Sequence, residues 1–127
     1  MSSEHDPAEW ASNAAYLRGI GLFNRHEFWE AHEAWEEIWL VVDGTQSDFL
    51  QGLIQAAAAL LKYRRDEPAP ALRLYNTSRE KLDRCPDYYM GLRVREFQAA
   101  LAEILAPVIR GPYQPLDESK IPIIRVA

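Results

Sequence analysis

The stretch that most constrains the fold is residues 49–65, which read FLQGLIQAAAALLKYRR. Apolar side chains occupy nearly the whole circumference of this segment when it is drawn as a helix, which is typical of the central helix of a small bundle. One stripe is polar, because Gln51 and Gln55 share a side and Lys62 continues it. An unpaired buried amide costs about 1–3 kcal/mol, so this stripe predicts a polar partner on a neighbouring helix.

The remainder of the chain also shows helical spacing, and no segment before residue 111 alternates with the period of a strand. The capping residues and breakers predict about five helices, at 7–23, 25–41, 47–65, 70–84 and 91–106. Residues 111–127 contain three prolines and predict an extended tail packed on the domain. The fold class is therefore all-α: a compact bundle over residues 1–110 with an extended, Pro-rich C-terminal tail at 111–127.

The segment 25–41 has a core face and a polar edge. At about 100° per residue, Phe28, Trp35 and Trp39 fall within roughly 40° of one another, which predicts the core face. His32 lies beside this face and Glu36 lies at its edge, one turn further on. A histidine and a glutamate are therefore expected to point at least partly inward.

Three other glutamates of the same segment fall on the opposite side. Glu30, Glu33 and Glu37 form a row that we interpret as a solvated face. A cation site on this row is the alternative, although carboxylate rows on helices are usually solvent-exposed.

The two polar stripes belong to segments joined by a short loop, so they are expected to meet. The predicted site is a polar cluster that either binds a small ligand or orders the core, because buried polar groups are normally paired. Its core is four residues, with three more nearby: His32, Glu36, Gln51 and Gln55, then Asn24, Glu33 and Trp39. Glu30 and Lys62 lie on the same two segments and complete the candidate set.

A metal-dependent, hydrolase-like enzyme that uses His32 and Glu36 is a second hypothesis, since imidazole and carboxylate both bind zinc, iron and manganese. The pattern does not extend to a known metal motif. Di-iron bundles need Glu-x-x-His on two helices, whereas Trp29 stands three residues before His32. We therefore expect no metal and no cofactor, and the sequence assigns no catalytic residue. A helical protein-interaction module is a third hypothesis.

Composition excludes several classes of partner. The chain has 127 residues, 48% of them hydrophobic, and a formal net charge of -5, which argues against nucleic acid and against anionic membranes as partners. Cys85 is the single cysteine, so an intrachain disulfide is impossible. The N-terminal residues do not resemble a secretory signal and no apolar run could span a bilayer, so the expected location is cytoplasmic. A homo-oligomer remains open.

The motifs resemble those of the DUF309 family, a group of small all-helical proteins of unknown function. The family pattern runs Phe-Asn, Glu-Ala-His-Glu, a further Glu, a Trp and then Gln-Gly-Leu-Ile-Gln. This chain matches it at Phe23, Asn24, Glu30, Ala31, His32, Glu33, Glu36, Trp39, Gln51, Gly52, Leu53, Ile54 and Gln55. Lys62 stands where the family often has a histidine, which removes one metal ligand that the resemblance would imply. The resemblance covers roughly residues 15–106, and it implies a fold and a site location without an activity.

Overall fold

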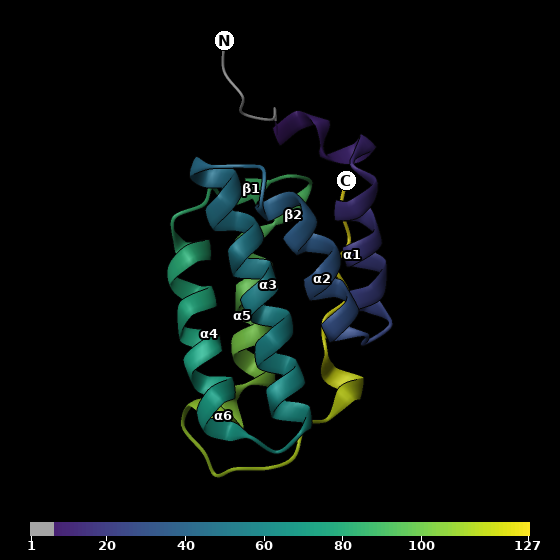
Figure 1. The fold of residues 1–127 in the computed structure, drawn as a ribbon. Helices are drawn as coiled ribbons and strands as arrows, with labels where there is room; N and C mark the ends of the chain where they lie inside the picture. Colours follow the sequence, from purple (N-terminus) through teal and green to yellow (C-terminus); the bar gives the residue numbers. More distant parts are fainter. Residues whose placement is uncertain (1–6) are drawn as a thin grey trace.

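The structure is a computed structural model that describes residues 7–127. Its described part contains six α-helices, and the predicted all-α class is confirmed. The long helix α3, Gly44–Arg64, lies between α2, Phe28–Trp39, and α4, Pro68–Asp83 (Figure 1). Twelve residues of α3 are buried. The central position predicted from its apolar circumference is therefore correct.

The N-terminal element is divided into two helices rather than one. A 3-10 helix, η1, spans Pro7–Ser12, and α1 spans Ala14–Asn24. The division occurs at Asn13, whose extended backbone lets its side-chain oxygen accept a hydrogen bond from the N–H of Tyr16 at 2.9 Å. The predicted continuous helix over 7–23 is wrong here because the cap at Asn13 begins a new helix.

α1 and α2 approach each other closely at Gly19. A Cβ atom on this glycine would lie 2.2 Å from Nε1 of Trp35, far inside van der Waals contact. The same indole nitrogen donates a hydrogen bond to the carbonyl oxygen of Tyr16 at 3.2 Å. The absence of a side chain at Gly19 therefore lets the largest core residue pack against the backbone of α1.

A short hairpin precedes α5 and was not predicted. Strand β1, Tyr88–Tyr89, pairs antiparallel with β2, Leu92–Arg93. The two turn residues, Met90 and Gly91, have φ angles of 48° and 77°, as two-residue hairpin turns require. α5 then spans Val94–Ile104 and the four-residue α6 spans Ala106–Ile109. Helix over 91–93 was therefore wrong, whereas the end of the helix before Pro107 was predicted.

Residues 111–127 pass along the bundle and return toward the hairpin (Figure 1). One 3-10 turn, η2 at Glu118–Lys120, interrupts this segment. Ile121 and Ile124 are buried in the core. The tail therefore contributes to the core. The predicted domain spans 1–110, and its part before residue 7 lies outside the described residues.

Candidate functional site

Four residues of the predicted cluster belong to α2 and α3: His32 and Glu36 lie on α2, and Gln51 and Gln55 lie on α3. The two helices run antiparallel and are joined by residues 40–43. His32 lies eight residues before this loop and Gln51 lies eight residues after it, so both occupy the same level of the bundle. Helical side chains lean toward the N-terminus of their helix, which directs His32 toward the next turn of α3, where Gln55 lies.

Three buried polar atoms on these helices have no hydrogen-bond partner among the described residues. They are Nδ1 of His32, Nε1 of Trp39 and Oε1 of Gln55. Leaving such an atom unpaired costs about 1–3 kcal/mol. We expected His32 to be buried and hydrogen-bonded within a cluster whose polar groups are all paired. His32 is mostly buried, yet its Nδ1 has no hydrogen-bond partner among the described residues.

His32 has two neighbours on its own helix. Its Nε2 lies 3.8 Å from Oε2 of Glu36, whose side chain is 44% exposed. Its ring stacks on Trp29, with a centroid distance of 5.1 Å and an interplanar angle of 24°. Trp29 is itself 54% exposed. The imidazole is thus held between a half-exposed carboxylate and an aromatic ring that is open to solvent on its outer side.

The helical wheel placed most of α2 correctly. Phe28 and Trp35 are fully buried, whereas Trp39 is only half-buried. The true core face is centred further round the helix, on residues that the wheel did not select: Ala31, Ala34 and Ile38. This shift explains how the Trp39 indole comes to edge the polar side.

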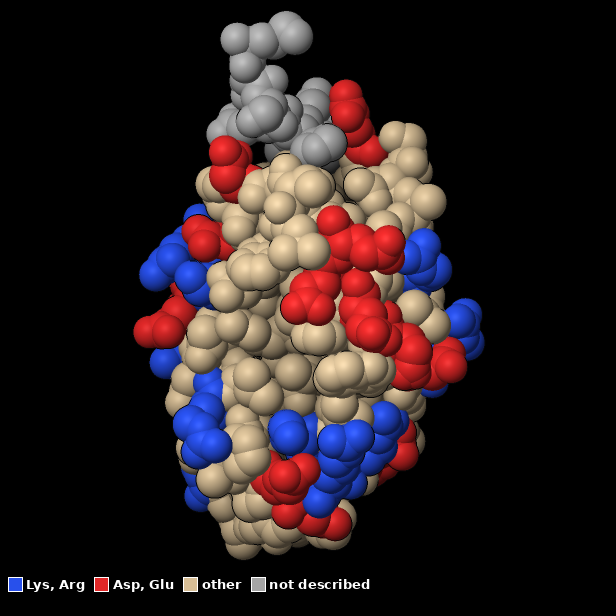
Figure 2. Space-filling model, viewed as in Figure 1, with Lys and Arg blue, Asp and Glu red and all other residues tan. Residues whose placement is uncertain are grey.

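The acidic row is exposed as expected. Glu30, Glu33 and Glu37 all lie at the surface, and Figure 2 shows acidic side chains gathered over α2. Glu37 forms an ion pair with Arg18 of α1. Glu30 and Glu33 therefore belong to the solvated face and do not point at the buried atoms.

Two other candidates bind elsewhere. The side-chain amide of Asn24 is hydrogen-bonded to the backbone of Ile124 in the tail. Lys62 lies two helical turns beyond Gln55, and its Nζ is 3.9 Å from Oε2 of Glu67. Lys62 does not form an ion pair with Glu36, because Glu67, in the turn between α3 and α4, provides a nearer carboxylate.

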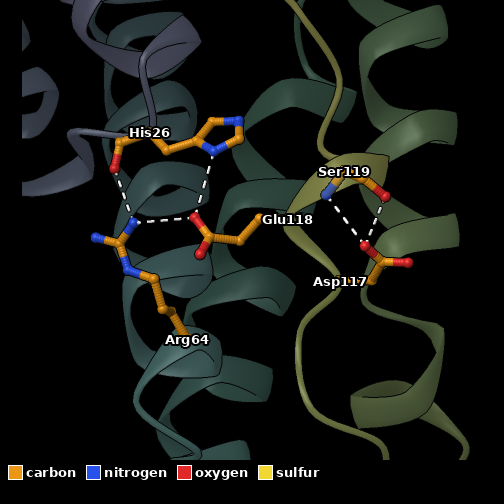
Figure 3. A network of polar contacts seen from close by, with 5 residues as sticks. All are labelled: His26, Arg64, Asp117, Glu118 and Ser119. Atoms are coloured by element: carbon orange, nitrogen blue, oxygen red, sulfur yellow. Dashed lines mark hydrogen bonds and ion pairs between the residues drawn. The ribbon is translucent and has the colours of Figure 1, made fainter.

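A second polar network joins three segments that are far apart in the sequence (Figure 3). Glu118 Oε1 lies 3.3 Å from Nδ1 of His26 and 3.5 Å from Nη1 of Arg64, which also donates a hydrogen bond to the carbonyl oxygen of His26 at 2.8 Å. The guanidinium of Arg64 covers the ring of Phe28, 4.9 Å from its centroid. The sequence does not predict this network, because no local pattern shows that the tail returns to His26.

The chemistry available at these sites is limited. Among residues 7–127, no group of three or more histidine, cysteine, aspartate and glutamate side chains is placed to hold a metal ion. Burial raises the pKa of the Cys85 thiol to about 11, which disfavours the thiolate.

In the described part of the chain, no helix has the length and apolarity that crossing a membrane requires.

The fold and the motif define a small helical domain whose function is unknown. A family model described as "Domain of unknown function (DUF309)" matches residues 16–74, which include most of α1, all of α2 and α3, and the start of α4. The resemblance to the DUF309 family that the motif predicted is confirmed over these residues.

Two relatives extend this comparison. The chain resembles the crystal structure of a conserved hypothetical protein from Thermus thermophilus, with a TM-score of 0.65 and 31% identity, over 72% of this chain and 95% of that one. It is also 30% identical over 84 residues to an uncharacterized protein from Aquifex aeolicus (strain VF5), which is 65% of this chain. The chain spans about a quarter of the length of that relative, since the match covers 25% of it.

Proposed function

We propose that this domain binds a small polar ligand on the α2–α3 side, on what we call the His32 face: Trp29, His32, Glu36, Trp39, Gln51 and Gln55. The three unpaired buried atoms carry this proposal. A cluster that only ordered the core would be expected to satisfy its own hydrogen bonds, since a half-satisfied network is less stable than an apolar one. Groups left unpaired at a cost in stability are typical of functional positions.

The chemistry of the three atoms describes the ligand. The indole N–H of Trp39 only donates, the amide oxygen of Gln55 only accepts, and Nδ1 of His32 does either according to its tautomer. A complementary molecule must therefore offer at least one acceptor and one donor, as a carboxamide does. The exposed ring of Trp29 adds a surface on which a planar group stacks. The proposed ligand class is a small planar molecule that carries an amide.

Nicotinamide is a suitable probe, with 3-methylpyridine as the control that keeps the ring and lacks the amide. In a titration followed by ¹H–¹⁵N NMR, nicotinamide should move the indole N–H resonance of Trp39 and leave that of Trp10 in place. Replacing the indole in Trp39→Phe removes one hydrogen bond and should weaken binding about fivefold to tenfold.

The matched control is Trp10→Phe, which changes a tryptophan that packs against Tyr16 at the N-terminal end of α1. It should bind nicotinamide like the unchanged protein. Equal binding of nicotinamide and 3-methylpyridine, or an unmoved Trp39 resonance at millimolar nicotinamide, would overturn the proposal.

A further inference from the structure

A cavity of about 580 Å³ lies away from the His32 face, between the tail and the hairpin with α5. It is half-open to solvent and is bounded on one side by the tail, which is fixed at two points. Asn24 holds the backbone of Ile124, and the N–H of Ala127 donates to the carbonyl oxygen of Gly91 at 3.1 Å. The hydroxyl of Tyr88 also donates to the carbonyl oxygen of Ala127. A space of this size matches the usual volume of small-molecule sites.

The floor of the cavity is apolar. Leu92, Phe97 and Ile124 line it and are each no more than 5% exposed. Ala100 and Pro122 continue the apolar wall on α5 and on the tail. A ligand that covers this floor would therefore contact it with an apolar part.

The rim carries two arginines, Arg93 and Arg125, and both are exposed. Within residues 7–127, neither forms an ion pair with a carboxylate. Arg93 instead covers the ring of Tyr88, 5.9 Å from its centroid. Glu96 is the one acidic side chain that lines the cavity among the described residues. Guanidinium groups without carboxylate partners beside an apolar floor favour an anion.

We infer that this cavity binds a small organic anion with an apolar body, of the medium-chain carboxylate class. The chain would lie on Leu92, Phe97 and Ile124, and the carboxylate would lie at the rim, between Arg93 and Arg125. This site is independent of the His32 face, so failure of either proposal leaves the other standing.

Three probes with the same chain separate charge from apolarity: octanoate, octanol and octylamine. In an NMR titration, octanoate should bind most tightly and octylamine most weakly, and the shifted amides should be those of 88–100 and 122–127. Raising the ionic strength should weaken the binding of octanoate and leave the binding of octanol unchanged, because exposed charges are screened by salt. Three results would each overturn the inference. They are binding of octylamine as tight as that of octanoate, chemical-shift changes confined to other parts of the protein, and no binding at several millimolar octanoate.

Substitutions at the rim and in the wall complete the test. Arg93→Gln and Arg125→Gln should each weaken octanoate about twofold to fivefold, as expected for exposed charge pairs, and leave octanol unaffected. Arg110→Gln is the control, since Arg110 is exposed and does not line the cavity. Ala100→Phe should abolish binding of both octanoate and octanol by filling the space, whereas Ala99→Phe, on the exposed neighbour, should not. If Ala100→Phe fails to fold, the two arginine variants decide the outcome alone.

Discussion

Asn24 and Ile124 lie a hundred residues apart in the chain and exchange two hydrogen bonds. Nδ2 of Asn24 donates to the carbonyl oxygen of Ile124 at 3.0 Å, and the N–H of Ile124 donates to Oδ1 of Asn24 at 2.8 Å. The side-chain amide therefore does for one tail residue what a neighbouring strand does in a sheet. Asn24 belongs to the family motif, so one polar residue of the candidate set has a structural task in this chain.

We predict that Asn24→Ala lowers the free energy of unfolding by about 1–3 kcal/mol, because the N–H and C=O of Ile124 lose their partners. Urea denaturation measures this change. Hydrogen exchange at the amide of Ile124 should accelerate more than exchange in α3. Asn76→Ala, which changes an exposed asparagine of α4, should stay within about 0.5 kcal/mol. Equal effects of the two variants would contradict the role of Asn24 in holding the tail.

Gly19→Ala should destabilise the protein by about 1–3 kcal/mol, since the added methyl group meets the indole of Trp35 within a packed core. Gly21→Ala is the matched control on the same helix: its nearest atom would be Nη1 of Arg25 at 3.8 Å. Alanine is the better helix former, so this control should be neutral or more stable by up to about 1 kcal/mol. In thermal unfolding, Gly19→Ala should lower the Tm, whereas Gly21→Ala should leave it unchanged or raise it. An unchanged Tm in Gly19→Ala would show that α1 and α2 are not in close contact there.

The sequence predicted the parts of the fold that local pattern controls. The apolar circumference of 49–65 predicted a central helix, and Pro107 predicted the end of α5 to within a few residues. The predicted start of the fourth helix at residue 70 was two residues late, because Pro68 and Pro70 both lie in the first turn of α4, where proline is tolerated. The hairpin at Tyr88–Arg93 escaped prediction because two-residue strands are too short to show alternation, and its Met-Gly turn lacks the usual Asn-Gly signal.

The candidate site was predictable on α2 and unpredictable wherever the tail is involved. The wheel placed His32 and Glu36 at the edge of the core, and both are partly buried. Asn24 was expected near the cluster, yet its partner is in the tail. The His26–Arg64–Glu118 network depends on the same long-range contact, which no local pattern encodes.

Metal analysis tests the donor set of the His32 face. A transition metal held by side chains usually needs three or four good ligands, and His32 with Glu36 supplies two. We predict that protein purified without a histidine tag contains well under one transition metal per chain by mass spectrometry. About one metal per chain, lost in His32→Ala, would make the metal-dependent enzyme the leading hypothesis in place of the ligand-binding domain.

Cys85 should be a poor nucleophile in the folded protein. Burial raises the pKa of its thiol from 9.0 to about 11, with Asp48 adding to the rise and Arg95 opposing it. A rise of about two units lowers the thiolate fraction at pH 8 about 100-fold, and burial limits access to the sulfur, so labelling by iodoacetamide should be much slower in the folded protein than in urea. Because the folded pKa lies above the unfolded one, the stabilising contribution is complete below about pH 9 and is lost as the pH rises toward 11. Cys85→Ser should flatten this part of the stability curve, since serine does not ionise in that range. Fast labelling of the folded protein at pH 8 would show that the thiol is accessible and ionised, and would make Cys85 a candidate reactive group.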